Sequence, residues 1–160
     1  MKKFFTVAAV SIASLVCNAQ STSPKSEVIT DSTQTKKALF SKANLWVANT
    51  WKSAKDVIQM KDEESGTIVV KGLLSTKVKV SMGVKLDGHT ESTITIKCKD
   101  GKVKIEFNDT RFVDTYRSWV TESEPKNEVK YWTKWVADVT VEQDALIASF
   151  KSALTKNDDF

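Results

Sequence analysis

Lysine is the residue whose placement in this sequence most clearly indicates chemistry, and that chemistry is the binding of anions. Between residues 77 and 107, three segments alternate apolar and polar side chains, so each would present one apolar and one polar face. The polar positions carry one acidic residue, Glu106, and seven lysines: Lys77, Lys79, Lys85, Lys97, Lys99, Lys102 and Lys104. The candidate binding residues among them are Lys79, Lys97, Lys99 and Lys104.

These lysines predict a cationic surface on one side of a sheet. Such a surface would attract an anionic partner, which we expect to be an anionic glycan, a lipid surface or an acidic protein. The alternative is a solvated sheet face whose lysines discourage edge-to-edge aggregation.

A second candidate feature is aromatic and lies in the least regular part of the sequence. Its members are Tyr116, Trp119, Tyr131, Trp132 and Trp135. Trp132 and Trp135 are three residues apart and would share one side of a helix. Their rings could stack on a sugar or anchor a protein partner, so both are candidate binding residues. The alternative is that these rings cover a small hydrophobic core.

Residues suited to catalysis or to a metal site are scarce. The one histidine, His89, follows Gly88 in an expected turn, with no Cys/His/carboxylate spacing beside it. Carboxylate pairs such as Asp62–Glu63 fall in expected loops, where burial would not raise a pKa into the range of a general acid. No phosphate-binding glycine loop, G-x-S-x-G or H-E-x-x-H motif occurs. We therefore expect no enzyme activity, no catalytic residue, no metal and no cofactor.

The first 19 residues are typical of a cleavable secretory signal. Two lysines precede an apolar stretch over residues 4–16, and small residues then precede a cut before Gln20. The stretch is too short to span a bilayer, so we expect no transmembrane segment. We expect the mature protein in the periplasm, at the cell surface or secreted. The alternative is a lipid anchor on Cys17, although Val16 stands where a small residue normally precedes such a cysteine.

Charge and cysteine content narrow the partners and the chemistry further. The full chain has a formal net charge of +4, and two of its lysines lie in the signal, so the mature protein is only mildly basic. Such a balance does not call for a nucleic acid partner. Without Cys17, Cys98 is the remaining cysteine, so no intramolecular disulfide can form. Cys98 falls on the apolar side of a strand, which favours a buried thiol over a reactive one.

The sequence divides into a leader and one domain. Residues 20–35 are rich in Ser and Thr and poor in bulky apolar residues, which predicts a flexible leader. From residue 36 to about 52, apolar side chains recur three and four residues apart, which predicts a helix. A second amphipathic helix is expected from Thr140, which with Gln143 fits a capping box, to about residue 156. The whole domain is expected over residues 36–157.

Five strands are expected between the two helices, at residues 55–61, 67–74, 78–86, 94–98 and 103–107. Their links, including residues 87–89 and the Asp100-Gly101 turn, are too short for crossovers, so the strands should be antiparallel. Residues 108–139 show no clear pattern, although Phe112, Val113 and Tyr116 could prolong the last strand. The apolar face of the sheet needs a cover, and the two helices are available for it. The sequence therefore predicts an α+β fold with both helices on one face of a single antiparallel sheet.

Residues 36–155 resemble an uncharacterised bacterial domain that occurs in exported proteins. The resemblance is carried by Trp46, the run WKSAKDVIQ at residues 51–59, Asp62, the Ser65-Gly66 turn and Lys71-Gly72. That family is described as having a fold like the TATA-box-binding protein, which implies a curved antiparallel sheet with helices on one side. It implies no activity, since a fold alone does not supply a function. The DNA-binding saddle of that fold uses apolar wedges, which the lysine face lacks, so we expect no nucleic acid partner.

Together these features predict an exported, non-catalytic module that binds an anionic partner. The alternative is a carrier of a small apolar ligand held between the helices and the sheet. The two differ in their interiors, because a carrier needs an apolar cavity on the order of several hundred Å³.

Overall fold

The structure is a computed structural model, and it describes residues 24–74, 77–79, 85–114 and 128–156 of the 160-residue chain. The expected signal at residues 1–19, with Cys17, lies outside the described residues, as do Tyr116 and Trp119. Within the described part, no helix is both long and apolar enough to cross a membrane.

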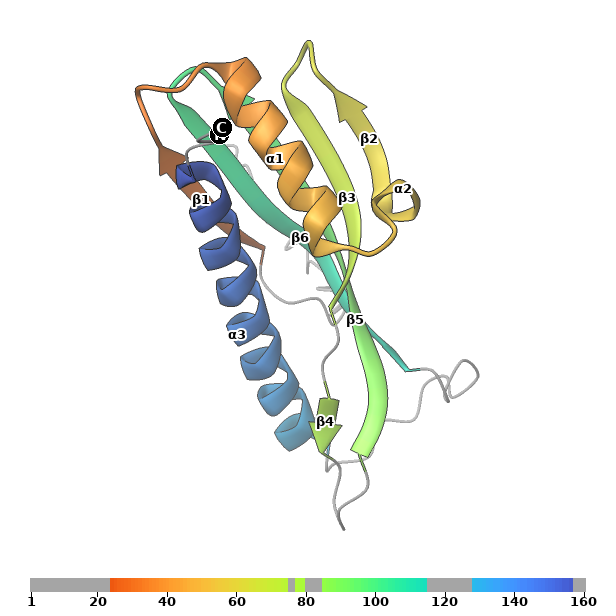
Figure 1. The fold of residues 1–160 in the computed structure, drawn as a ribbon. Helices are drawn as coiled ribbons and strands as arrows, with labels where there is room; N and C mark the ends of the chain where they lie inside the picture. The colour runs from red at the N-terminus through yellow and green to blue at the C-terminus, as the bar shows by residue number, and fades with distance from the viewer. Residues whose placement is uncertain (1–23, 75–76, 80–84, 115–127, 157–160) are drawn as a thin grey trace, which may run out of the picture.

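One antiparallel sheet forms the framework of the molecule (Figure 1). In the described part its strands are β1 (Lys25–Thr30), β2 (Ile58–Asp62), β3 (Thr67–Leu74), β4 (Lys77–Lys79), β5 (Lys85–Lys99) and β6 (Lys102–Asp114). They lie in the order β1-β6-β5-β3-β2, and β4 pairs with β5 beside this path. The long strands β5 and β6 form a hairpin closed by Asp100 and Gly101, whose φ of 70° is the left-handed conformation that such a turn requires.

The two long helices, α1 (Lys36–Thr50) and α3 (Glu128–Thr155), lie on the same face of this sheet (Figure 1). A short helix, α2 (Ala54–Val57), leads from α1 into β2. At the start of α1, the Thr35 hydroxyl accepts a hydrogen bond from the Ala38 amide, and the Asp100 carboxylate accepts one of 2.6 Å from the Lys36 amide. The predicted α+β fold, with both helices on one face, is confirmed.

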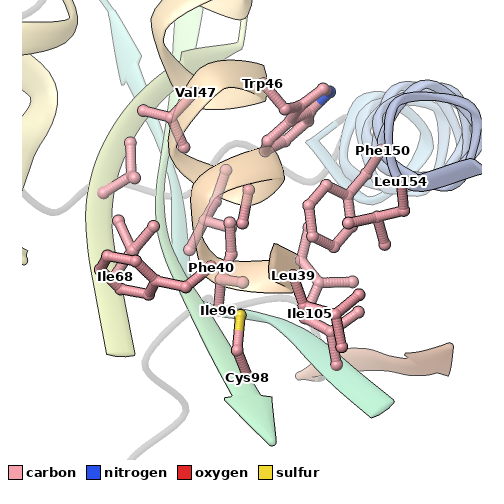
Figure 2. Packing of buried hydrophobic residues seen from close by; sticks show 14 of the residues in the cluster. Leu39, Phe40, Trp46, Val47, Ile68, Ile96, Cys98, Ile105, Phe150 and Leu154 are labelled. Atoms are coloured by element: carbon pink, nitrogen blue, oxygen red, sulfur yellow. The ribbon is translucent and has the colours of Figure 1, made fainter. Parts of the chain in front are cut away.

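The core lies between the helices and the inner face of the sheet (Figure 2). The inward positions expected from alternation in β5 and β6 are all buried: Ile94, Ile96, Cys98, Val103, Ile105 and Phe107. Trp46 of α1 packs against Phe150 of α3 with ring centroids 4.8 Å apart and ring planes inclined by 55°, and its indole donates to the Ser149 hydroxyl at 3.2 Å. The contacts of Trp46 hold α1 and α3 together, and the buried side chains of the core pack both helices against the sheet.

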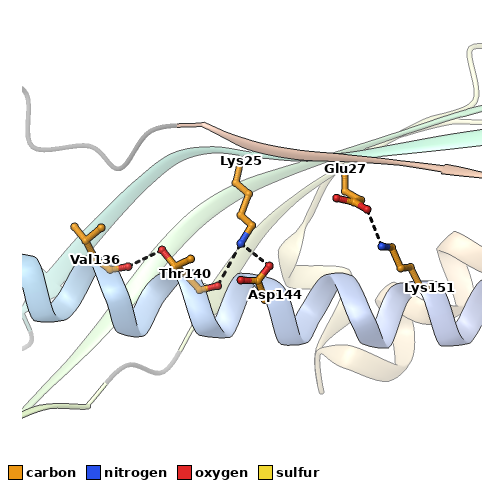
Figure 3. A network of polar contacts seen from close by, with 6 residues as sticks. All are labelled: Lys25, Glu27, Val136, Thr140, Asp144 and Lys151. Carbon is orange, nitrogen blue, oxygen red and sulfur yellow. Dashed lines mark hydrogen bonds and ion pairs between the residues drawn. The ribbon is translucent and has the colours of Figure 1, made fainter.

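The expectation of a flexible leader over residues 20–35 is wrong for residues 25–30, which form β1 along the edge of β6. The sequence composition of this segment did not indicate a strand, because two of the three side chains that point inward from β1 are charged. Lys25 donates to the Asp144 carboxylate at 2.6 Å, and Lys151 donates to the Glu27 carboxylate at 2.7 Å (Figure 3). The third inward residue, Ile29, packs against the core. The domain therefore begins before residue 36.

Two strand boundaries also differ from the prediction. The expected strand at 55–61 begins as α2, and β2 starts only at Ile58. The expected strand at 78–86 is divided, because Lys77–Lys79 form β4 and Lys85 already belongs to β5, which pairs antiparallel with it. The expected turn at residues 87–89 is instead part of β5, where His89 lies opposite Val113 of β6.

The C-terminal helix is longer than expected. It starts at Glu128, within the segment that showed no clear pattern, and the Thr140–Gln143 capping box is wrong because both residues lie inside α3. The Thr140 hydroxyl donates to the Val136 carbonyl one turn earlier, at 2.8 Å. The suggested extension of the last strand through residues 112 and 113 is confirmed, since β6 runs to Asp114.

Candidate functional site

The face of the sheet opposite α1 and α3, here called the outer face, carries lysines at the closed end of the β5–β6 hairpin. Lys97 lies directly opposite Lys104, and Lys99 lies directly opposite Lys102. The intervening residues point into the core, so alternation directs all four lysines outward. The side chains of Lys97 and Lys104 are 55% and 41% exposed. We call Lys97, Lys99, Lys102 and Lys104 the lysine cluster.

The one acidic residue predicted on this face, Glu106, lies against the lysine cluster. Its carboxylate is 2.7 Å from the Lys104 ammonium and 3.6 Å from that of Lys97. The hydrogen bond from Lys104 is the main cause that lowers the pKa of Glu106, so the carboxyl stays ionised. The cluster thus keeps an excess of positive charge, with two of its four lysines in contact with a carboxylate.

A second ionic group lies further along the outer face. Glu91 of β5 accepts two hydrogen bonds from the Arg111 guanidinium, at 2.9 and 3.1 Å, and lies 3.2 Å from the Lys71 ammonium. The Arg111 guanidinium is the main cause that lowers the pKa of Glu91. Sequence reasoning missed this group because Arg111 lies in a segment without a clear pattern, and only the cross-strand register places Glu91 opposite Arg111.

Lys79 does not join the lysine cluster, contrary to expectation. It lies in β4 opposite Lys85, whereas Lys97 lies opposite Lys104. The distance along β5 between these two positions is roughly 40 Å at about 3.3 Å per residue. Lys79 and Lys97, which were expected on one cationic surface, are therefore far apart along β5, and the side chain of Lys79 lies outside the described residues.

The aromatic candidates do not form a described surface either. Trp135 is 3% exposed, and its indole nitrogen donates to the Thr90 hydroxyl at 3.1 Å. Its ring is therefore part of the interior and presents no face to an external ligand. Trp132 lies in α3, and its side chain is outside the described residues.

The sequence of this sheet has recognisable relatives. The family described as "Domain of unknown function (DUF4468) with TBP-like fold" matches residues 26–113. The chain belongs to the DUF4468 family. The match starts inside β1, in agreement with the structural role of that strand.

Two crystal structures share the DUF4468 fold of this chain. One is of a DUF4468 family protein from Bacteroides ovatus, with a TM-score of 0.66, 19% identity and coverage of 86% of this chain and 88% of that one. The other is of a TBP-like protein from Parabacteroides distasonis, with a TM-score of 0.62, 15% identity and coverage of 84% and 94%. None of the curated proteins matches the chain.

The residues that carried the DUF4468 resemblance serve packing. A Cβ atom at Gly72 would lie 2.8 Å from the Trp51 ring, so the absent side chain provides the space that the tryptophan fills. Trp51 in turn meets Trp46 edge to face, with centroids 5.5 Å apart. Gly66 has a φ of 69°, and its carbonyl accepts from the Cys98 amide at 2.8 Å. The residues that carry the family resemblance therefore stabilise the fold, and they do not indicate a function.

The DUF4468 interior holds polar residues that sequence reasoning did not identify. Thr90, Ser92, Thr110 and Gln143 are at most 3% exposed. The Ser92 and Thr110 hydroxyls lie 2.9 Å apart, and the Gln143 amide donates to Thr110 at 3.4 Å. Each polar group thus has a partner, as buried polar groups require, which indicates a structural network.

Cys98 and His89 both lie on β5. Cys98 is 1% exposed, and burial raises the pKa of its thiol to about 11, so the predicted buried thiol is confirmed. Among the described residues, no group of three or more His, Cys, Asp or Glu side chains could hold a metal ion.

The carrier interpretation requires an apolar cavity between helices and sheet. In the described part of the chain, this space is occupied by the packed side chains of the core. A surface hollow of about 530 Å³ lies instead at one end of this layer, where Ile29, Asp31, Leu39, Gly101 and Leu154 meet. The hollow is open to the surface and is lined by residues of β1, α1, α3 and the hairpin turn, and the carrier interpretation stays a prediction.

Proposed function

We propose that this DUF4468 domain is an exported, non-catalytic module that binds an acidic glycan on the lysine cluster. The supporting observation is the placement of the four lysines as two directly opposed pairs, Lys97 with Lys104 and Lys99 with Lys102. Like charges directly opposite each other on a sheet destabilise it. A stabilising anion supplied by a partner would offset that cost.

The alternative is a solvated sheet face whose lysines discourage edge-to-edge aggregation, and the position of the lysine cluster argues against the second part of it. β5 and β6 are inner strands, because β3 pairs with the far side of β5 and β1 with the far side of β6. The unpaired backbone groups that attract another strand belong to edge strands. Lysines on inner strands are therefore not needed for that protection.

A glycan suits the surroundings of the cluster better than a bilayer does. The cluster lies on a strand face whose neighbouring outward residues include hydroxyl side chains, Thr67 and Thr95. Hydroxyl groups can donate to and accept from sugars. Membrane-surface binding commonly uses an amphipathic helix with an exposed apolar face, whereas α1 and α3 turn their apolar faces to the core.

The test is a charge reversal with a matched control. Changing Lys97, Lys99, Lys102 and Lys104 to Glu should abolish retention on immobilised polygalacturonate, because attraction becomes repulsion. The control changes four exposed lysines elsewhere to Glu: Lys37, Lys52, Lys55 and Lys156. It has the same net charge and should keep most of the retention.

The control should melt near the wild type, because its four side chains lie at the surface. The cluster variant should melt somewhat lower, because Glu106 would face two carboxylates in place of Lys97 and Lys104, so circular dichroism is used to show that it is folded. Equal retention of the two variants would contradict the proposal. Binding of the wild type to anionic phospholipid vesicles, without binding to the polymer, would replace the glycan with a membrane.

A further inference from the structure

We infer that Glu106 is a built-in competitor of the partner, and that it restricts the lysine cluster to ligands with several closely spaced anionic groups. This inference rests on the proposed function and names the residue that sets its selectivity. It begins from the contacts of Glu106, whose carboxylate meets Lys104 at 2.7 Å and Lys97 at 3.6 Å.

Glu106 is held where a ligand anion would bind. Its side chain is 21% exposed, so the carboxylate lies along the sheet, next to the two lysines, instead of extending into water. Because Glu106 and Lys104 belong to the same strand, the carboxylate is always present at the cluster at a high effective concentration. A ligand anion that pairs with Lys97 or Lys104 must therefore displace a group that cannot diffuse away.

This competition affects small and polymeric ligands differently. A ligand with one anionic group exchanges one weak surface ion pair for another and gains little. In the described part of the chain, no carboxylate pairs with Lys99 or Lys102. A polymer can bind these two lysines first, and its next anionic group then competes with Glu106 as part of the same molecule. The cluster should therefore select polyanions over single anions.

Glu91 provides a matched control on the same face. It also contacts two cations, Lys71 and Arg111, and its side chain is 18% exposed. It differs from Glu106 in lying outside the lysine cluster. Replacing either glutamate by glutamine removes one negative charge and retains the side-chain shape.

The experiment measures the binding of wild type, Glu106→Gln and Glu91→Gln to polygalacturonate and to monomeric galacturonate. Glu106→Gln should bind the polymer about three- to tenfold more tightly, because two weak ion pairs no longer compete. Glu106→Gln should also reduce the ratio of the affinity for the polymer to the affinity for the monomer. Glu91→Gln should bind as the wild type does.

The outcomes separate this inference from the proposed function. If the wild type binds the polymer and Glu106→Gln shows no gain, Glu106 is not a competitor. An equal gain in Glu91→Gln would assign the effect to overall charge and would overturn the inference as well. If neither the wild type nor Glu106→Gln binds the polymer, the proposed function fails. A melting temperature measured for each variant confirms that the fold is retained.

Discussion

At the scale of single residues, Glu142 is the described carboxyl whose surroundings least favour its charge. It lies on α3, where one of its oxygens is buried without a hydrogen-bond partner. Burial is the main cause that raises the pKa of Glu142 to about 7, and the neighbouring Asp138 carboxylate adds to the shift. Near neutral pH, the folded domain therefore holds a partly protonated carboxyl.

This shift makes the stability of the domain depend on pH. The folded-state pKa of Glu142 lies above the value of an unfolded glutamate, so the folded state binds the proton more tightly. The contribution of Glu142 to stability is present below pH 4 and is lost as the pH rises through about 7. We expect Glu142→Gln to raise the melting temperature relative to the wild type, and to do so more at pH 8 than at pH 5.

Thermal melts at the two pH values, followed by circular dichroism, would test this expectation. Glu63→Gln serves as a control, because Glu63 is exposed in the turn between β2 and β3. An effect of Glu142→Gln that is the same at both pH values would show that the carboxyl is not protonated in the folded domain.

At the scale of elements, β1 closes one edge of the sheet and ties it to α3. It pairs with β6 over its whole length, and its inward charges meet Asp144 and Lys151 of the helix (Figure 3). Surface ion pairs of this kind stabilise little individually. The main contribution of β1 comes from the backbone pairing and from Ile29, which packs against the core.

Removal of β1 should therefore destabilise the domain. We expect a chain that begins at Thr35 to lose about 2 kcal/mol or more, the cost of exposing one isoleucine and the groups beneath it. The melting temperature should fall by roughly 5–10 °C in a domain of this size. A chain that begins at Pro24 keeps β1 and should melt as a chain that begins at Gln20 does. Equal melting of the two shortened chains would contradict the role given to β1.

The elements that the sequence predicted well are those whose inward residues are apolar. The second half of β5 alternates Ile94, Ile96 and Cys98 with outward polar residues, and its register could be predicted from this pattern alone. The first half places Thr90 and Ser92 inward, so it has no apolar alternation and resembles a turn. Its burial depends on partners from β6 and α3, which the local sequence does not reveal.

For the candidate site too, the sequence predicted the face on which a side chain lies better than it predicted which strands lie side by side. Alternation placed Lys97, Lys99 and Lys104 on the outer face correctly, because the Asp100-Gly101 turn fixes the register of the hairpin. Lys79 was placed wrongly because the length of β5, and hence the position of β4 along it, depends on the polar interior. Side-chain spacing within a strand was therefore predictable, whereas the position of a strand along its neighbour was not.

At the scale of the whole molecule, β1 begins beside the lysine cluster, whereas α3 lies on the opposite face of the sheet. In β1, Lys25 lies opposite Phe107 and Thr30 lies opposite Lys102, so β1 runs alongside the cluster. The end of α3 lies near the cluster end of the sheet, because the Gln34 side chain donates to the Leu154 carbonyl and the Gly101 amide donates to the Gln34 carbonyl. Ser26 lies opposite Glu106 and Val28 lies opposite Lys104, so β1 borders the cluster from its first residues onward.

This arrangement predicts how attachment to a surface affects binding. A chain immobilised through residues before Pro24 should bind soluble polygalacturonate more slowly and to a lower level than the free protein, because Ser26 of β1 lies opposite Glu106 and the support would stand beside the lysine cluster. A chain immobilised through residues after Lys156 should bind nearly as the free protein does, because α3 lies on the face of the sheet opposite the cluster. Surface plasmon resonance with both orientations measures this difference. Equal binding in the two orientations would contradict the placement of the site.

The pairing of β1 with elements from the other end of the chain also sets an order of assembly. The residues joined by the Lys25–Asp144 contact are 119 positions apart, and those joined by Glu27 and Lys151 are 124 positions apart. β1 is thus the first described element to be synthesised, yet it cannot find its partners until β6 and α3 exist. Contacts between such distant positions form late, because closing a long loop costs conformational entropy before the contacts can stabilise the chain. Until then the edge of β6 stays open, and a chain halted at this stage is the species most prone to associate with other strands.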